Sequence, residues 1–167
     1  MAYRNKVFVS FDGDNDIQYY RLMLAWKQSD HTSFNFTNAH DLNTARDTST
    51  EETIKRKLRE RLINSKIFIS LIGENTRYLY KFVRWEIEQA ISLNIPIIAV
   101  NLNGNRHLDT LRCPPILKEQ TAIHTSFNSK IIEYALSNWD NQYRNLEQKS
   151  NTGPFYYNNS VYTRLGL

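Results

Sequence analysis

Residues 66–73 read Lys-Ile-Phe-Ile-Ser-Leu-Ile-Gly, a run in which apolar side chains follow one another almost without a break. Such a run is typical of a strand in the middle of a parallel sheet, because helices cover that strand on both faces. Residues 6–11 and 95–102 have the same character and predict two more buried strands. Residues 33–37 alternate polar and apolar side chains, which suits an edge strand, and residues 121–125 suit a fifth, short strand.

Helical patterns separate these strands. Apolar side chains recur at three- and four-residue spacing over residues 17–28, over residues 83–91 and again after residue 128. Residues 49–52 read Ser-Thr-Glu-Glu, a capping box that predicts a helix over residues 50–64. Strands that alternate with helices predict a doubly wound α/β domain, in which a mostly parallel five-stranded sheet carries helices on both faces.

Three loops are expected to meet at one edge of this sheet. They follow the first, second and third strands, at residues 10–16, 38–48 and 73–80. In doubly wound sheets, ligands bind beyond the carboxyl ends of the strands, where the strand order reverses. The helix that begins after the third loop carries Glu86, which we expect about two turns from its start.

Glu86 differs from the other glutamate of this helix, Glu88, in its neighbours. It follows Phe82 by four residues and is next to Trp85, so its neighbours along the helix are apolar, whereas Glu88 can pair with Arg84 on a solvated face. A carboxylate held against aromatic surface has its charged form disfavoured, which suits an acid or base that works near neutral pH. The competing interpretation is a boundary residue at the edge of an amphipathic helix.

Length and composition bound the remaining possibilities. A chain of 167 residues with 41% hydrophobic and 23% charged residues suits one domain, which we place at residues 1–145. Residues 146–167 are expected to form a polar linker and an aromatic tail that packs on the domain or on a neighbour. No apolar run approaches twenty residues and residues 1–6 lack a signal-peptide pattern, so we expect a cytoplasmic protein without a membrane contact.

The net charge of +4 is too mild to indicate nucleic-acid binding by itself. Five cationic side chains are concentrated in residues 55–61. Such a run most often forms the solvated face of an amphipathic helix, and a patch for phosphate-bearing ligands or an acidic partner is the alternative.

Several known chemistries fit the sequence poorly. A calcium loop starting at Asp12 would need glycine and glutamate where Ile17 and Met23 stand. Haloacid-dehalogenase phosphatases and two-component receivers also place acids after the first strand, but their later acidic and lysine positions are not matched. The acidic loop at residues 10–16 would repel the phosphate of a flavodoxin cofactor, and no glycine-rich dinucleotide fingerprint is present. The four histidines have no metal-ligand spacing, so no metal site is expected.

Three segments together resemble a TIR domain. Residues 7–11 resemble the opening strand of that family, which ends in serine and an aromatic, and residues 68–76 resemble its central strand and the loop after it. Residues 82–86 match the Trp-x-x-x-Glu signature of NAD-consuming TIR enzymes, with Phe82 in the tryptophan position. The resemblance covers roughly residues 5–140, and it extends to short prokaryotic TIR proteins such as the TIR component of the Thoeris antiphage system.

The resemblance implies a flavodoxin-like TIR fold and an NAD+ glycohydrolase or ADP-ribosyl cyclase activity. NAD+ would be the substrate, without a further cofactor, and the product would be an ADP-ribose-derived nucleotide signal that we expect to be cyclic. The implied partners are further copies of the chain on activation, a separate effector that senses the product and a phage-derived trigger. A non-enzymatic TIR scaffold that acts by self-association is the alternative.

The resemblance also implies roles for individual residues. Glu86 is the expected catalytic carboxylate, which contacts the ribose next to nicotinamide. Aromatic side chains are expected to enclose the nicotinamide, and Arg46, in the loop that closes over the site, is expected to contact a phosphate. The substrate-binding residues expected in this way are Phe8, Ser10, Phe11, Asp12, Arg46, Phe82 and Trp85.

Overall fold

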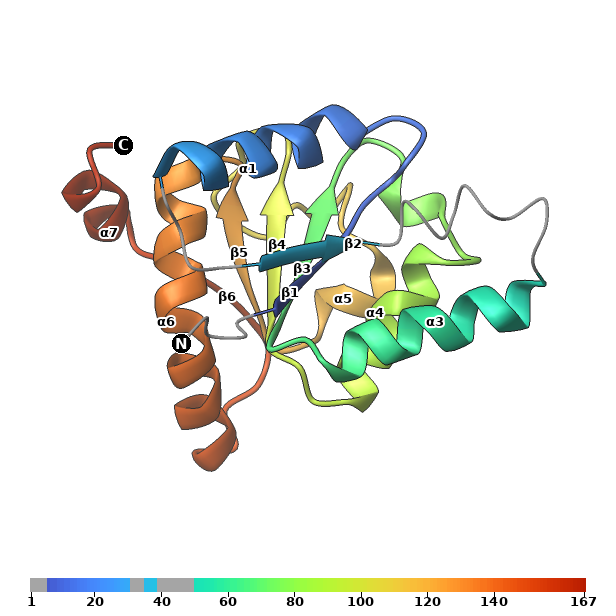
Figure 1. The fold of residues 1–167 in the computed structure, drawn as a ribbon. Coiled ribbons are helices and arrows are strands. Elements are labelled where there is room, and N and C mark those ends of the chain that lie inside the picture. Colours follow the sequence, from blue (N-terminus) through green and yellow to red (C-terminus); the bar gives the residue numbers. More distant parts are fainter. Residues whose placement is uncertain (1–5, 31–34, 39–49) are drawn as a thin grey trace, which may run out of the picture.

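The computed structural model describes residues 6–30, 35–38 and 50–167. Its centre is a sheet of six parallel strands in the order β2-β1-β3-β4-β5-β6 (Figure 1). The strands are β1 (Lys6–Ser10), β2 (Asn35–Asn38), β3 (Ile67–Ile72), β4 (Ile97–Asn101), β5 (Ala122–Ser126) and β6 (Pro154–Tyr156). The parallel five-stranded sheet and the edge position of β2 are therefore confirmed, and the short strand β6 is an addition that the sequence did not predict.

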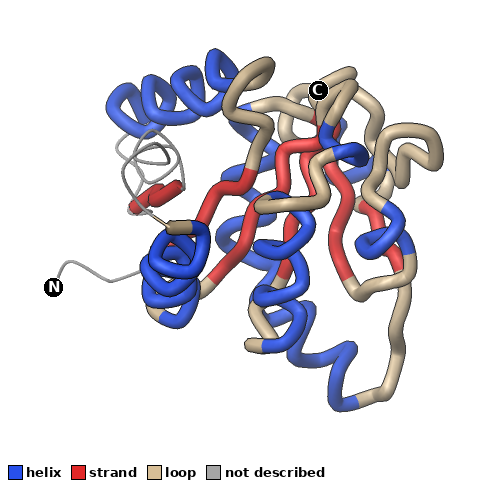
Figure 2. Tube along the Cα trace, turned by 90° about the vertical axis from the view of Figure 1, so that its right-hand side faces the viewer, coloured by secondary structure: helices blue, strands red, loops and turns tan. Residues whose placement is uncertain are grey.

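Helices cover both faces of the sheet, as Figure 2 shows from a direction at right angles to Figure 1. Side chains of α1 (Ile17–Asp30) and α6 (Ser129–Gln148) belong to one hydrophobic cluster, and those of α3 (Glu51–Ile63), α4 (Val83–Ser92) and α5 (Pro115–Lys118) belong to the other. The predicted α/β architecture is thus confirmed. Within the described ranges, no helix is both long and apolar enough to span a membrane.

The two clusters explain why β3 is apolar along its whole length. Every side chain of this strand is buried. Ile67, Ile69 and Leu71 point into the cluster with α1 and α6, whereas Phe68 and Ile72 point into the cluster with α3 and α4. Successive side chains of a strand alternate between its faces, so a strand covered on both sides requires apolar residues at nearly every position.

Two helix starts differ from the sequence predictions. Thr50 rather than Ser49 caps α3, because the Thr50 hydroxyl accepts from the Thr53 N–H at 3.2 Å; Ser49 itself lies outside the described residues. Residues 76–78 form a short 3₁₀ helix, η1 (Thr76–Tyr78), so α4 begins only at Val83. Glu86 consequently lies in the first turn of α4 and not two turns into it.

The C-terminal segment packs against the sheet of its own chain. α6 continues to Gln148, β6 then pairs with β5, and α7 (Asn159–Arg164) follows. Tyr162 of α7 has no exposed surface. Its hydroxyl accepts from the backbone N–H of Ser126 at 3.4 Å, and the Arg106 guanidinium lies 4.1 Å from its ring centroid. Tyr162 therefore anchors this segment beside the carboxyl end of β5.

Replacing Tyr162 by alanine is expected to lower the free energy of unfolding by about 3 kcal/mol, because a fully buried aromatic ring and its contacts are lost. Urea unfolding followed by far-UV circular dichroism measures the change. Tyr80→Ala is the control, since that tyrosine is 63% exposed and should change the free energy by about 0.5 kcal/mol or less. Equal effects of the two substitutions would mean that the tail does not stabilise the domain.

Candidate functional site

The strand order reverses between β1 and β3. From β1 the chain passes through α1 to β2 at the edge of the sheet, then through α3 to β3 on the other side of β1. The connecting helices α1 and α3 contribute to the two opposite clusters. The carboxyl ends of β1 and β3 therefore border the crevice in which doubly wound proteins bind ligands. We call this place the β1/β3 crevice.

Ser10 and Glu86 meet beside this crevice. Ser10 is the last residue of β1, and its hydroxyl donates to Oε1 of Glu86 at 3.1 Å. Only 2% of the Glu86 side chain is exposed, and Ser10 is buried as well. A buried carboxylate is costly unless it is hydrogen-bonded, and the first turn of a helix favours negative charge. The serine hydroxyl and the start of α4 thus both stabilise Glu86 in place.

Asp12 organises the loop that follows β1. Its Oδ1 accepts from the backbone N–H groups of Asp14 and Asn15, and its Oδ2 accepts from the Asn15 side-chain amide at 2.7 Å. The Asp12 carbonyl accepts from the N–H of Asp16 at 2.8 Å. Both carboxylate oxygens of Asp12 are therefore engaged inside its own loop.

Asp16 differs from Asp12 in its surroundings. It precedes α1, is 7% exposed, and lies against Gly73, the residue after β3. A Cβ atom on Gly73 would come within 2.2 Å of Oδ2 of Asp16, so the carboxyl occupies the space that only glycine leaves free. That oxygen has no hydrogen-bond partner among the described residues.

The ionisation of Asp16 is correspondingly shifted. Burial, followed by the charge of Asp12, raises its pKa from 3.8 to about 6, and the charge of Arg112 opposes this shift. Loss of hydration disfavours the charged form of a carboxyl, and a neighbouring carboxylate disfavours it further. Asp16 is therefore a carboxyl that changes its charge close to neutral pH.

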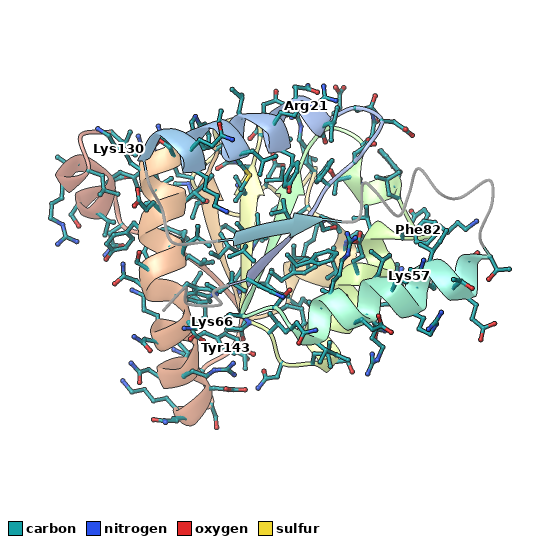
Figure 3. The ribbon with its side chains drawn as sticks, viewed as in Figure 1. Arg21, Lys57, Lys66, Phe82, Lys130 and Tyr143 are labelled. Carbon is teal, nitrogen blue, oxygen red and sulfur yellow. The ribbon has the colours of Figure 1, made fainter. Side chains whose placement is uncertain are left out.

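Three of the aromatic residues expected in the site lie in the core. Phe8 has no exposed surface and stacks on Phe68, with the ring centroids 5.6 Å apart. Phe11 stacks on Tyr20 with the centroids 5.1 Å apart. Phe82 is buried at the start of α4, on the side of the sheet that α3 covers (Figure 3). In this arrangement, the ring of Phe8 could contact a ligand only if the core opened.

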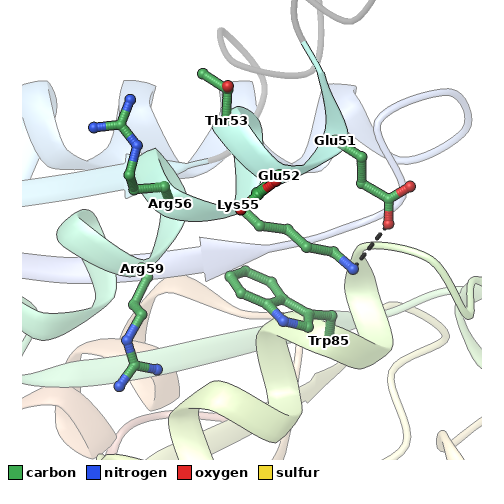
Figure 4. Close-up of a pocket in the computed structure, with 7 residues that line it drawn as sticks. All are labelled: Glu51, Glu52, Thr53, Lys55, Arg56, Arg59 and Trp85. Carbon is green, nitrogen blue, oxygen red and sulfur yellow. Dashed lines mark ion pairs between the residues drawn. The ribbon is translucent and has the colours of Figure 1, made fainter.

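Trp85 lies in a surface groove between α3 and α4 (Figure 4). The groove has a volume of about 790 Å³, and three α3 cations line it with Trp85. The Lys55 ammonium lies 5.5 Å from the Trp85 ring centroid and 2.8 Å from a Glu51 carboxylate oxygen. Arg59 donates to the Gln89 side chain across the groove. Much of the charge is thus engaged within the groove itself, as on a solvated helix face.

Other residues considered from the sequence contribute less to the described site. Arg46 and the rest of residues 39–49 lie outside the described residues, so the phosphate contact of Arg46 stays a prediction. His124 is fully buried on β5, and burial lowers its pKa to about 4, which leaves the ring neutral at pH 7. In the described part of the chain, no three His, Cys, Asp or Glu side chains are grouped closely enough to hold a metal ion.

The structure therefore brings together part of the expected set. Ser10 ends β1, Asp12 lies in the loop after it, and Glu86 reaches Ser10 from α4. Asp16 and Gly73 were not among the expected site residues. A sequence signal existed for both, since Gly73 directly follows a buried strand and Asp16 directly precedes a helix. Their contact joins positions 57 residues apart, however, and helix or strand periodicity carries no information on such pairs.

The chain matches a family of known proteins. A family described as Thoeris protein ThsB, TIR-like domain, matches residues 8–107. The matched segment runs from β1 past the end of β4 and comprises 100 of the 167 residues, from position 8 to position 107 inclusive. It contains both sides of the β1/β3 crevice, including Ser10, Asp16, Gly73 and Glu86.

Asp16→Asn is expected to stabilise the protein by about 1 to 3 kcal/mol at pH 8, and by about 0.5 kcal/mol or less at pH 4. The pKa of Asp16 is about 6 in the folded protein, above the value of 3.8 for an unperturbed aspartate. As the pH rises from 3.8 to about 6, the carboxyl therefore ionises in the unfolded chain before it does so in the folded protein, and the free energy of unfolding of the wild type falls. Asparagine has the same shape and does not ionise. Thermal and urea unfolding across this pH range measure the difference.

Asp14→Asn is the matched control, because Asp14 is an exposed carboxyl in the same turn. No pH-dependent gain in stability is expected from it. An equal gain in both variants would assign the effect to the overall charge of the turn and not to the buried position of Asp16.

Proposed function

The chain belongs to the family of Thoeris ThsB proteins with a TIR-like domain, and from this membership we propose that it cleaves NAD+ at the nicotinamide–ribosyl bond. The product would be an ADP-ribose-derived nucleotide, which we expect to be cyclic and to act as an antiphage signal. The observation that carries the proposal is the Glu86 carboxylate, which Ser10 orients at the carboxyl edge of the sheet.

The role proposed for Glu86 in the reaction follows from the chemistry of the leaving group, nicotinamide. Nicotinamide is bound to ribose as a pyridinium ion, so it departs as a neutral molecule when it takes the electron pair of the C1′–N bond. The positive charge passes to the ribose, in an oxocarbenium-like transition state. A carboxylate beside that ribose stabilises the developing charge and can accept a hydrogen bond from a ribose hydroxyl. This reaction requires no metal ion and no second cofactor.

The burial of Glu86 is consistent with an enzyme that needs activation. Because Glu86 is only 2% exposed, NAD+ can reach its carboxylate only after neighbouring side chains move. Assembly of several copies after a phage-derived trigger would supply that movement, and a separate effector would then sense the product. These partners follow from the family resemblance, and the buried carboxylate is the structural reason to expect a regulated site.

A non-enzymatic scaffold is the second candidate, and an exposed apolar patch favours it. Tyr78 and Leu111 are 59% and 76% exposed. Arg77 connects the two segments, because it donates to the backbone carbonyl of Leu111 and its guanidinium lies 5.3 Å from the Tyr78 ring centroid. Self-association through this patch would make the chain an interaction module without turnover.

Glu86→Gln is expected to abolish nicotinamide release from NAD+, because a neutral amide does not stabilise the ribosyl cation. Purified protein at high concentration with a crowding agent, and protein from phage-infected cells, would be incubated with NAD+ and the products resolved by chromatography and mass spectrometry. Glu88→Gln is the matched control: this glutamate lies two residues away, pairs with Arg84 on the surface and should leave turnover unchanged.

The outcomes separate the two candidates. Nicotinamide from the wild type and from Glu88→Gln, but not from Glu86→Gln, supports the enzyme, and the mass of the second product distinguishes hydrolysis from cyclisation. Equal turnover in Glu86→Gln removes Glu86 from the mechanism. If every preparation is silent while the wild type self-associates, the scaffold is the better account.

Ser10→Ala is expected to lower kcat about tenfold with little change in KM, because Glu86 loses the hydroxyl that orients it. Ser70→Ala is a close control. Ser70 lies beside Ser10 in the sheet register and is equally buried, but its hydroxyl has no hydrogen-bond partner among the described residues. If both substitutions reduced kcat alike, the loss would come from packing in the sheet and not from the contact with Glu86.

A further inference from the structure

Two buried carboxyl groups flank the β1/β3 crevice from opposite faces of the sheet. Glu86 comes from α4, in the cluster with α3. Asp16 stands at the start of α1, which packs into the other cluster. Asp16 contacts Gly73 after β3, whereas Glu86 contacts Ser10 at the end of β1. A substrate bound between the two strand ends would therefore lie between the two carboxyl groups.

The hydrogen bonds of these carboxyl groups point to different tasks. Ser10 donates to Glu86, and donors within the loop occupy both oxygens of Asp12. Oδ2 of Asp16 has no donor among the described residues, although the residue is more than nine-tenths buried. A buried acceptor oxygen without a partner is unusual in a folded protein, and a catalytic role is one of the reasons for which it is retained. Here it lies at the crevice where a ligand is expected.

We propose that Asp16 is the proton acceptor of the cleavage reaction proposed above. The inference rests on that reaction. As the C1′–N bond breaks and its electron pair leaves with nicotinamide, an oxygen or nitrogen nucleophile forms the new bond to C1′. Oδ2 of Asp16 takes the proton that this nucleophile loses. With water the product is ADP-ribose, and with a group of the substrate itself the product is cyclic.

The environment of Asp16 suits this task. A general base works best when its pKa lies near the pH of the reaction, and burial raises the pKa of Asp16 to about 6. Asp12 in the same loop contributes to the rise, and Arg112 in the turn before α5 opposes it. Glu74, next to Gly73, is exposed to solvent. Carboxyl groups in different environments commonly divide charge stabilisation and proton transfer between them.

Gly73 provides a second way to perturb the same oxygen. An alanine there would bring Cβ within 2.2 Å of Oδ2, so the carboxyl would have to move. Gly73→Ala therefore displaces Asp16 without removing its charge, whereas Asp16→Asn removes the charge without changing the shape of the side chain. The two variants test position and proton transfer separately.

The experiment compares wild type, Asp16→Asn, Gly73→Ala and the control Asp14→Asn, using NAD+ under the activating conditions described above. We would measure kcat and KM for nicotinamide release from pH 4.5 to 8.5, with thermal unfolding of each variant at every pH. The wild-type kcat is expected to rise with pH and to be half-maximal near pH 6. Asp16→Asn should lower the plateau about a hundredfold, keep KM within about threefold and abolish this rise.

Gly73→Ala is expected to lower kcat in the same direction, and Asp14→Asn should match the wild type. If Gly73→Ala does not fold, Asp16→Asn decides alone, because its amide is isosteric with the carboxyl. A wild-type rise in kcat near pH 6 that is lost only when Asp16 is changed or displaced supports the proposal.

The failures of the two proposals are distinguishable. A wild type that releases no nicotinamide at any pH overturns the proposed function and the inference with it. An active wild type whose kcat and pH profile survive in Asp16→Asn overturns the inference alone. A rise in KM with unchanged kcat also overturns it, since Asp16 would then bind substrate without accepting a proton.

Discussion

The burial of β3 on both faces is the constraint on which the rest of the structure depends. None of its six residues is exposed, so each face of the strand needs its own layer of helices. α1 and α6 provide one layer, and α3 and α4 provide the other. Because the chain reaches β3 only after it has passed around β1 to β2, the two layers diverge between β1 and β3. The crevice between β1 and β3, with the carboxyl groups beside it, is therefore a consequence of packing helices on both faces of the apolar strand β3.

Most of the fold could be predicted from periodicity, and the failures have local causes. The helix boundaries of α1 and α3 lie within two residues of those predicted. α4 begins with its apolar stripe at Val83, but later than the expected start two turns before Glu86, because η1 and the turn after it occupy the intervening residues. β6 was missed because a strand of three residues is too short for an alternating pattern to be recognised.

The site could be predicted only in part, since its contacts join distant positions. The resemblance to TIR domains singled out Ser10 and Glu86, and their hydrogen bond spans 76 residues of sequence. It could not show which aromatic side chains face a ligand: alternation along β1 directs Phe8 into one cluster and Val7 into the other, and both side chains are fully buried. Asp16 and Gly73 were not predicted, because their contact depends on Gly73 having no Cβ atom. A contact of that kind between distant positions produces no periodic pattern in the sequence.

Trp85 gives the chain a spectroscopic probe next to Glu86. The three tryptophans occupy different surroundings: Trp139 is buried in the core, Trp26 packs at the edge of the same cluster, and Trp85 lies in the groove under the Lys55 ammonium. A cation close to an indole ring alters the intensity and wavelength of its fluorescence. Any displacement of α4 relative to α3 changes the distance between Lys55 and Trp85. Intrinsic emission can therefore follow the movement of the helix that carries Glu86, without a label and before any product is formed.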